Sequence, residues 1–305
     1  MLSYLIRRLV HSTVVIIGVT LVVFVLMRLT GDPVLLLLPS NSSPQQIADL
    51  RHSLGLDQPI WIQYVQFLAH AAQGDFGVSF RNNEPAMSLV LERLPATLQL
   101  TVAAFAVTLL VSLPVGILSA TRPNSFADAL ARVLALLGQA VPSFWLGIML
   151  ILIFAVTLRW LPPFGTGGPQ HLVLPAITLG TYSAAVTSRM LRSAMLEVFG
   201  SDYIRTARGK GLREQAVVFR HALRNAALPV LTMLGLQVGT LLGGAVVTEY
   251  VFAYPGMGRL VLQAIGNRDF AVVQAFVVLM ALVIAVINIL IDLLYSVLDP
   301  RIKYQ

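Results

Sequence analysis

The chain has 305 residues, of which 57% are hydrophobic and 11% are charged, and its formal net charge is +7. A soluble domain carries about 25% charged residues, so this composition indicates a membrane protein and argues against one large soluble core. The sequence has no cysteine, which excludes disulfides and thiolate metal sites, and its five histidines show no zinc-ligand spacing. In a membrane chain, an excess of positive charge is typical of Lys and Arg gathered in cytoplasmic loops.

Six segments are apolar over about 20 residues, which is the length that crosses roughly 30 Å of hydrocarbon. They are residues 9–29, 97–119, 133–158, 172–195, 229–251 and 270–295. The first follows Arg7 and Arg8 but is too long for the apolar region of a signal peptide and has no small-x-small cleavage site, so we expect a retained anchor. The expected fold is an all-α membrane protein with six transmembrane helices.

The distribution of basic residues predicts the orientation of these helices. With the N-terminus inside, the inner segments hold fourteen Arg and Lys residues and the outer segments hold seven. This bias predicts that both termini are cytoplasmic. The expected parts are an anchor span (1–29), an extracytoplasmic loop (30–96), a five-span core (97–295) that contains a basic loop (196–228), and a cytoplasmic tail (296–305).

The outer loop between the first two spans is the only sizeable soluble part that we expect. Ser43 is placed to cap a short helix with Pro44 at its first position, and this helix should end near Gly55. A second amphipathic helix, beginning near Ile60, is expected to end at Gly74. The loop is too small for an independent enzyme, and we expect a small lid on the outer mouth of the bundle.

Ionisable residues are few inside the expected spans. Arg189 and Asp292 lie near inner ends, and Glu249 lies at the outer end of span five. Charges in hydrocarbon are costly and are therefore functional candidates, although capping or snorkelling at an interface is the simpler explanation. The sequence shows no chain of Asp, Glu and His across the bilayer, which argues against a proton-coupled carrier. It shows no Ser–His or Asp–Asp pair either, which argues against a membrane protease.

The chain also lacks a phosphate-binding loop for ATP. Its one Gly-Lys pair, Gly209-Lys210, precedes Gly211, where such a loop requires Ser or Thr. If the chain takes part in active transport, the energy must come from another polypeptide.

A basic segment, residues 202–229, interrupts the apolar sequence and reads DYIRTARGKGLREQAVVFRHALRNAALP. We expect a short helix that is capped by Asp202, runs to Lys210 and is broken by Gly209 and Gly211.

A second helix is expected over residues 213–226, stopped by Pro229. Its apolar positions recur at helical spacing: Leu212, Ala216, Phe219 and Leu223. Arg213, Arg220 and Arg224 recur beside them. Topology or binding to anionic lipid could explain the charge. A docking helix for a cytoplasmic partner explains the glycine breaks as well.

Short stretches along nearly the whole chain carry a family resemblance. They are TGDP, LGLDQP and GDFGVSF in the outer loop, LPATLQLT opening span two, LPAITLG in span four, DYIRTARGKGL and RHALRNAALPVLT in the basic segment, GLQVGTLLGGAVVTEYVFAYPGMGRL in and after span five, and DLLYSVLDPRI near the end. With them the chain resembles the dipeptide/oligopeptide family of bacterial ATP-binding-cassette importer permeases. The wider importer class has Glu-Ala-Ala where this chain has Arg205, Thr206 and Ala207, and this chain has a longer loop from Gly211 to Pro229.

The resemblance implies a multi-pass permease subunit in the bacterial inner (plasma) membrane that imports peptides. It implies no catalytic site and no cofactor in this chain, because ATP and Mg are bound by partner ATPase subunits. The expected partners are a second homologous permease in a heterodimer, two cytoplasmic ATP-binding subunits, an extracytoplasmic substrate-binding protein and membrane lipid, with no nucleic acid. The sequence itself leaves a homodimer open.

Other functions stay open at this point. The same resemblance covers permeases for glutathione and for nickel chelates. An ion-coupled secondary carrier is disfavoured by the missing charged relay and by the lack of paired broken helices. A membrane-embedded enzyme is disfavoured because no acid–base or metal constellation is evident.

The resemblance also implies a coupling helix, which sits in a cleft of the ATPase and transmits its closure to the spans. The residues expected to couple to the ATPase are Tyr203, Arg205, Thr206, Ala207, Arg208, Lys210, Gly211, Arg220, His221, Arg224 and Asn225. We expect Gly211 to supply the bend.

Span five is the expected wall of the pathway. Gly235, Gly239 and Gly243 are four residues apart and share one helix face, which suits either a packing groove or a smooth wall. Gln237 and Thr240 offer neutral hydrogen bonds to a passing peptide backbone. The expected pathway or gate residues are therefore Gly235, Gln237, Gly239, Thr240, Gly243 and Glu249. Glu249 is expected at the outer mouth, where a substrate-delivery protein would dock. Six further acidic residues of the outer segments are candidates for the same surface, with solvation as the simpler explanation for scattered charges: Asp32, Asp57, Asp75, Glu84, Glu92 and Asp269.

Overall fold

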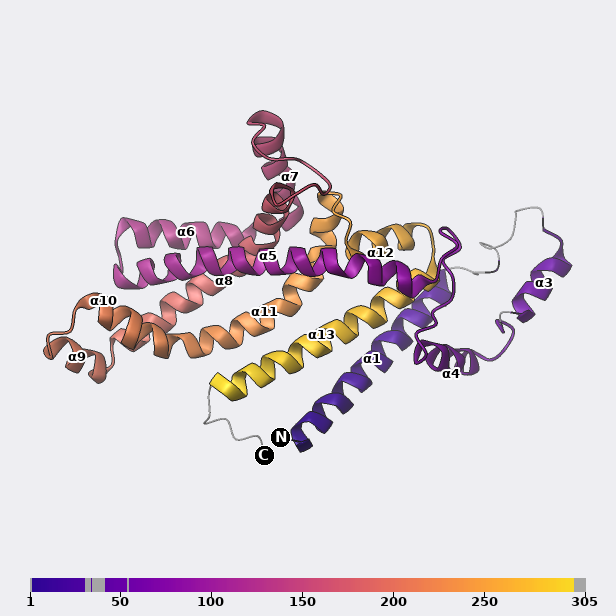
Figure 1. Ribbon diagram of the computed structural model, residues 1–305, viewed down its shortest axis with the longest axis horizontal. Helices are drawn as coiled ribbons and strands as arrows, with labels where there is room; N and C mark the ends of the chain where they lie inside the picture. The colour runs from indigo at the N-terminus through magenta and orange to yellow at the C-terminus, as the bar shows by residue number, and fades with distance from the viewer. Residues whose placement is uncertain (1, 31–33, 35–41, 54, 299–305) are drawn as a thin grey trace. The chain divides into compact units, whose positions relative to one another are not determined.

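The computed structural model describes residues 2–30, 34, 42–53 and 55–298, and this part of the chain is almost entirely helical and contains no strand (Figure 1). The chain divides into two compact units. One comprises Met1–Pro95 with Arg259–Gln305, and the other comprises Ala96–Gly258. The two boundaries fall inside helices α5 (Ala86–Thr121) and α12 (Met257–Gly266).

The first unit is built on a pair of long helices, α1 (Leu2–Thr30) and α13 (Phe270–Leu298). These helices pack against each other and run side by side in Figure 1. Two short helices, α3 (Pro44–Ser53) and α4 (Ile60–Ala71), follow α1 in the outer loop. The helices predicted at Ser43 and near Ile60 are thus confirmed. The Ser43 hydroxyl accepts a hydrogen bond from the Gln46 amide (3.3 Å), and α4 ends at Ala71, three residues before Gly74.

The second unit contains residues 96–121 of α5 and the helices that follow it as far as α11, and α8 lies at its centre. In chain order they are α6 (Phe126–Ala140), α7 (Ser143–Leu150) with a π-helical continuation (Ile151–Thr157), α8 (Gln170–Phe199), α9 (Asp202–Gly209), α10 (Glu214–Ala216), a second π-helical stretch (Val217–Ala222) and α11 (Leu223–Val251). Helix α8 packs on α6, α7 and α11. Helices α9 and α10 form the connection between α8 and α11 (Figure 1).

Three described helices are long and apolar enough to cross a membrane: Ala86–Thr121, Glu214–Val251 and Phe270–Ile291. Residues Phe126–Ala140 and Ser143–Thr157 would make a fourth span as a bent pair, and Val10–Leu26 is a shorter apolar helix. The all-α fold is confirmed for the described residues, whereas the six-span topology stays a prediction.

The expected third span, residues 133–158, is not one straight helix. It starts earlier, at Phe126, and bends by 108° at Val141 and Pro142. Val141 is extended, with φ −77° and ψ 124°, because the ring of a following proline disfavours helical geometry in the residue before it.

The prediction that Pro229 stops a helix is wrong, because Pro229 lies inside α11. The proline is on an exposed side of the helix, so its ring and the carbonyl that it leaves without an amide partner do not disturb the packed side. Membrane helices tolerate proline where neighbouring groups satisfy the freed backbone carbonyl. Asp32 and residues 299–305 of the predicted tail lie outside the described residues.

Candidate functional site

Helix α9 ends in a defined turn at Gly211. The Gly211 amide donates to the Arg208 carbonyl (2.9 Å), and the Leu212 amide donates to the Ala207 carbonyl (3.4 Å). These two bonds form a Schellman motif, which needs a residue with positive φ, and Gly211 has φ +77°. The prediction that Gly211 supplies the bend is confirmed. The predicted cap is wrong, since Ser201 holds the N-cap position and Asp202 is the first helical residue.

One side of the basic segment is buried. Ile204 and Ala207 of α9 pack with Val217, Val218 and Ala222, in a cluster that also includes Leu191 and Met195 of α8 and Val230 and Leu234 of α11. The basic segment is therefore attached to two long helices by apolar contact along its length.

The apolar stripe predicted from the sequence packs only in part, because Leu223 packs against the buried cluster and Ala216 is half-buried. Leu212 and Phe219 are 42% and 58% exposed. Residues Val217–Ala222 are π-helical, and a π-helix has more residues per turn than an α-helix. The side that packs therefore shifts away from a stripe counted at 3.6 residues per turn.

The other side of the basic segment is exposed and mostly basic. Most of the predicted coupling residues lie on it: Tyr203, Arg205, Thr206, Arg208, Lys210, Gly211, Arg220, Arg224 and Asn225. His221 is half-buried, and Ala207 is buried, so Ala207 cannot form part of an exposed docking face. Arg208 is oriented by the Glu214 carboxylate (2.7 Å) and by the ring of Phe199, whose centroid lies 5.6 Å from its guanidinium carbon.

A buried ion pair between α6 and α8 was missed by the sequence analysis. The guanidinium of Arg192 donates to both carboxylate oxygens of Asp128 (2.7 and 2.9 Å), and the hydroxyl of Ser119, on α5, also donates to this carboxylate. The Asn124 amide adds a further hydrogen bond (3.0 Å). This cluster ties the ends of three helices together.

The available sequence signal for this cluster was Ser125-x-x-Asp128, a spacing typical of a helix N-terminus. The Asp128 amide donates to the Ser125 hydroxyl (3.2 Å), as that motif predicts. What the local pattern could not show is that Arg192, 64 residues further on, is the partner of the carboxylate.

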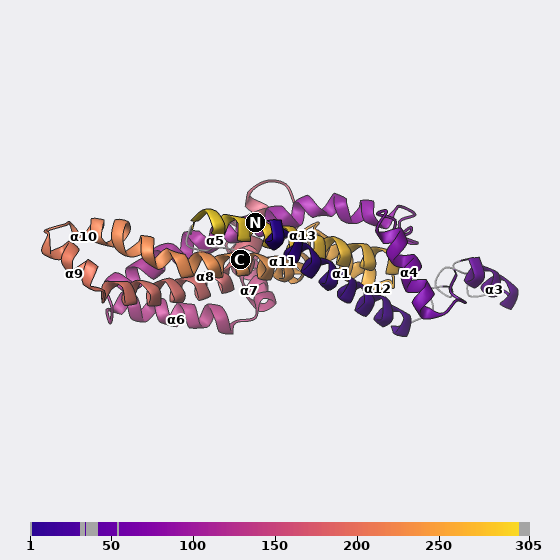
Figure 2. The ribbon, with the colours of Figure 1, turned by 90° about the horizontal axis from the view of Figure 1, so that it is seen from below.

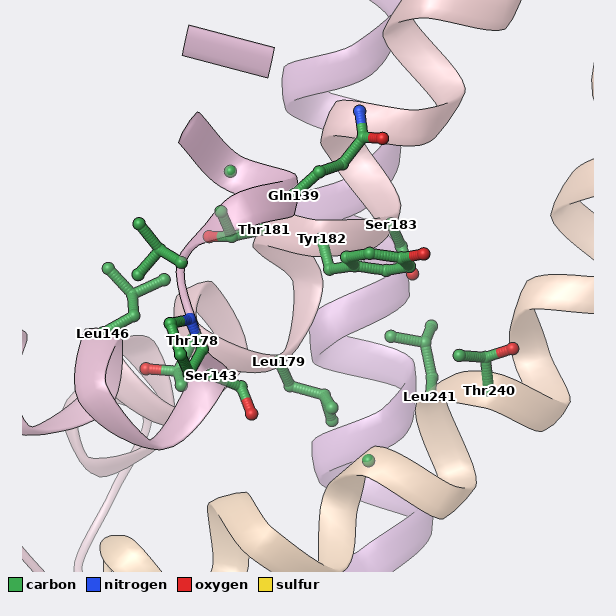
Figure 3. Close-up of a pocket in the computed structure, with 14 residues that line it drawn as sticks. Gln139, Ser143, Leu146, Thr178, Leu179, Thr181, Tyr182, Ser183, Thr240 and Leu241 are labelled. Carbon is green, nitrogen blue, oxygen red and sulfur yellow. The ribbon is translucent and has the colours of Figure 1, made fainter. Parts of the chain in front are cut away.

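A pocket of about 290 Å³ lies between α6, α7, α8 and α11 (Figure 3). Its polar lining is neutral: Gln139, Ser143, Thr178, Thr181, Tyr182, Ser183 and Thr240. In Figure 3, Thr240 and Leu241 extend from α11 and Tyr182 and Ser183 from α8. None of its lining residues is charged, so the pocket offers hydrogen bonds without selecting for charge.

The predicted pathway residues do not all lie together. Thr240 lines the pocket. Gly239 and Gly243 face open space, because a Cβ on either would meet nothing within 4 Å. Gly235 and Gln237 are buried instead, and the side-chain oxygen of Gln237 accepts a hydrogen bond from the Thr187 hydroxyl (3.2 Å). The three glycines therefore pass from the packed interior to an open surface along α11.

Glu249, the last predicted pathway residue, is fully buried near the C-terminal end of α11. Its carboxylate accepts a hydrogen bond from the Thr97 hydroxyl (2.6 Å), and the Thr97 oxygen accepts one from the Met257 amide (2.9 Å). The Glu249 backbone carbonyl accepts a bond from the Tyr254 amide (2.8 Å). Glu249 thus holds residues 249–257, which we name the outer turn, against the start of span two.

Two positions in this region require glycine, because other atoms lie where a Cβ would be. A Cβ on Gly256 would overlap the carboxylate of Glu249, and a Cβ on Gly258 would overlap the Cα of Val246. These contacts explain the spacing in YPGMG, which the sequence analysis noted as a motif without a physical reason.

The outer acidic residues are not all solvated. Asp57, Asp75, Glu84 and Glu92 are exposed, as predicted. The Asp57 carboxylate accepts a hydrogen bond from the His52 ring (2.6 Å), and this bond raises the pKa of His52. Asp269 is only 3% exposed, which corrects the prediction. It accepts a hydrogen bond from the Ser79 hydroxyl (2.5 Å) and one from the Val272 amide (3.4 Å) at the start of α13, so it is a buried cap.

These features define a class: an integral membrane transport component with a polar pocket between apolar helices and a basic connection anchored at both ends. Residues 112–304 match the family of binding-protein-dependent transport system inner membrane components, and residues 1–101 match the N-terminal part of such membrane components. The chain belongs to this family and is a multi-pass inner-membrane permease.

Curated relatives align over 100% of both chains. The chain is 43% identical to a dipeptide transport system permease protein of Alkalihalophilus pseudofirmus, 41% identical to that of Escherichia coli, and 41% identical to a glutathione transport system permease protein of Salmonella paratyphi A. Its fold is similar to that of an inward-facing methionine ABC transporter (TM-score 0.57, 21% identity), over 70% of this chain and 97% of the other.

Proposed function

We propose that this chain is the permease subunit of an ATP-driven peptide importer and forms half of the translocation pathway. The observation that carries the proposal is full-length similarity, above 40% identity, to permeases whose names specify dipeptides or glutathione. Glutathione is itself a small peptide, so both names describe substrates with peptide bonds. The neutral pocket fits this chemistry, because peptide amides need hydrogen-bond partners and the pocket presents no charge.

In the proposed topology the chain crosses the membrane six times with both termini in the cytoplasm. The basic connection between α8 and α11 then lies inside, which agrees with the greater number of Lys and Arg residues in cytoplasmic loops. The outer turn lies on the opposite side, at the far end of α11. The anchor (1–29), outer loop (30–96), core (97–295) and tail (296–305) keep their proposed roles.

The basic segment is proposed to dock in a cleft of a cytoplasmic ATPase subunit. Its exposed face carries Tyr203, Arg205, Lys210 and Arg220, while its buried face is attached to α8 and α11. A push on the exposed face therefore acts on both long helices at once. Ala207 supports this role from the buried side.

The proposed pathway includes the neutral pocket and the open glycine face of α11. A peptide would pass Thr240 and the hydroxyls of α8 with Gly239 and Gly243 leaving room beside it. Glu249 is proposed to close the outer end by holding the outer turn in place.

The proposed partners are a second homologous permease, two ATP-binding subunits and an extracytoplasmic binding protein. ATP and Mg are proposed to bind to the ATPase subunits. Within the described residues no group of three or more His, Cys, Asp or Glu is placed to hold a metal ion.

The test is co-isolation followed by an ATPase assay. The chain is expressed with the products of its neighbouring genes, and the assembly is isolated in lipid nanodiscs with its binding protein. Addition of a dipeptide or of glutathione is expected to stimulate ATP hydrolysis. Stimulation by a metal chelate or sugar, with none by any peptide, would overturn the proposed substrate class.

A further inference from the structure

Helix α4 is bound to α1 at a defined position along that helix. The Tyr64 hydroxyl donates to the Ile17 carbonyl (2.7 Å) and lies 2.9 Å from the Thr20 hydroxyl. The ring of Phe24 lies 5.4 Å from that of Tyr64 and 5.8 Å from that of Phe67. Figures 1 and 2 both show α4 beside the C-terminal half of α1.

This position is inside the apolar part of α1, not beyond its end. The apolar helix extends over Val10–Leu26, and Thr20 and Phe24 both lie within it. A helix rises 1.5 Å per residue, so Thr20 lies about 9 Å before Leu26 along the axis. If α1 crosses the membrane, its partner α4 is below the surface of the hydrocarbon.

The side of α4 that does not contact α1 is apolar and exposed. Trp61 is 68% exposed and Val65 is 62% exposed, and their spacing of four residues places them on one face. The helix, IWIQYVQFLAHA, contains no Asp, Glu, Lys or Arg.

Both glutamines of α4 have partners within the protein. The Gln63 amide donates to the carbonyls of Leu56 (3.2 Å) and Gln58 (2.6 Å). The Gln66 amide donates to the Gln58 side chain (3.0 Å). Hydrocarbon offers no hydrogen bonds, so polar groups that enter it must be paired internally. These glutamines meet that requirement, whereas a helix in water has no need to meet it.

We propose that α4 lies within the outer leaflet of the membrane, with Trp61 and Val65 in contact with lipid acyl chains. This inference rests on the proposed topology, in which α1 is a membrane span. It replaces the expected aqueous lid with a short membrane-embedded helix over residues 60–71. Only the remainder of the outer loop then faces the extracytoplasmic water.

The absence of cysteine makes this depth measurable with single-cysteine variants. The test uses the assembled transporter in lipid vesicles and a membrane-impermeant maleimide applied from both sides. The three variants are Val65→Cys, Asn82→Cys and Leu110→Cys. Val65 and Asn82 are exposed in the chain, and Leu110 lies in the apolar helix Ala86–Thr121 and is 74% exposed.

The expected result is fast labelling at Asn82→Cys and labelling at least about tenfold slower at Val65→Cys, because a thiol reacts as a thiolate and hydrocarbon disfavours the charged form. Leu110→Cys should also be slow, and all three should label fully in denaturant. Fast labelling at Val65→Cys overturns the proposal. If that labelling is slowed only by adding the binding protein, the face is a protein docking site instead. Fast labelling at Leu110→Cys would contradict the proposed topology itself. This control therefore separates a failure of the topology from a failure of the proposal for α4.

A second measurement avoids any change in α4. The chain has three tryptophans, Trp61, Trp145 and Trp160, so Trp145→Phe with Trp160→Phe leaves Trp61 as the sole reporter. Vesicles containing lipids brominated along the acyl chain are expected to quench its fluorescence, and aqueous iodide is expected not to. Quenching by iodide without quenching by brominated lipid would overturn the proposal.

Discussion

The two ends of helix α11 differ in whether their charged side chains are exposed and in why they contain glycine. At its start, in the basic segment, the charged side chains are exposed, and a glycine with positive φ makes the turn. At its end, in the outer turn, the charged residue Glu249 is fully buried, and the glycines are needed because other atoms approach them closely. A surface that must receive a partner leaves its charges available, whereas a turn that must keep its shape buries them.

This difference predicts where substitutions act on stability and where they act on coupling. In the outer turn, and in the Asp128 cluster that supports α8, changes should destabilise the fold. On the exposed face of the basic segment, changes should leave the fold intact and reduce the coupling of ATP hydrolysis to uptake.

The largest effect on stability is expected at Asp128. Asp128→Asn removes one partner of a buried ion pair, which costs about 3 kcal/mol when the other charge stays unpaired. Asp202→Asn is the matched control, because the Asp202 side chain is 94% exposed and lies 3.5 Å from Arg205. Thermal unfolding of the purified chain should show a large shift for the first variant and almost none for the second. Equal small shifts would mean that the cluster does not hold the three helices together.

The next effect is expected at Gly258. Gly258→Ala places a Cβ against the backbone of Val246, so α11 and α12 must move apart, at a cost of about 1–3 kcal/mol. Gly266→Ala in the same helix is the control, because a Cβ there meets nothing within 4 Å. The unfolding midpoint should fall for Gly258→Ala and stay or rise for Gly266→Ala. A tolerated Gly258→Ala would show that the start of α12 is not tightly packed against α11.

A smaller effect on stability, and a larger one on function, is expected at Gly211. Gly211→Ala forces a Cβ into a backbone with φ +77°, at a cost of about 1 kcal/mol. Gly209→Ala is the control, since Gly209 ends α9 without positive φ and has open space around it. The ratio of substrate-stimulated ATP hydrolysis to uptake should change in Gly211→Ala and stay unchanged in Gly209→Ala. The same ratio in both variants would remove Gly211 from the coupling mechanism.

The basic segment also shows which structural features could be predicted from the sequence. Helix α9 and the bend at Gly211 could be predicted because they depend on neighbouring residues and on glycine geometry. The packed stripe could not, because the π-helical residues Val217–Ala222 change the period on which the stripe was counted. The exposed positions of Tyr203 and Arg205 agree with the prediction for the docking face, and the burial of Ala207 does not.

Buried charges were the least predictable feature. Glu249 and Asp128 depend on Thr97 and Arg192, which are distant in sequence, so no local pattern reveals the pairs. The neutral pocket was also difficult to predict from the sequence, because residues of α6, α7, α8 and α11 line it together. Of the predicted pathway residues, Thr240 alone lines this pocket.

The smallest effect on stability is expected for the exposed pair of Arg208 and Glu214. Their side chains are 43% and 60% exposed, so Glu214→Gln should cost only about 0.2–1 kcal/mol. Loss of the pair leaves Arg208 less well oriented, and a weaker interaction with the ATPase subunit should follow. Binding of the isolated ATPase to the permease in nanodiscs measures this, and Glu84→Gln in the outer loop is the control. A loss of stability above this range would show that the ion pair mainly stabilises the fold, which would contradict a role in the docking face.

The central claim is that the basic segment receives a force from a separate ATPase. The most direct test is uptake of a labelled dipeptide into proteoliposomes that contain either this chain alone or the chain assembled with its second permease and ATPase subunits, with binding protein outside and ATP inside. We predict no accumulation with the chain alone and ATP-dependent accumulation with the assembly. Accumulation by the chain alone, without any nucleotide-hydrolysing subunit, would contradict the account.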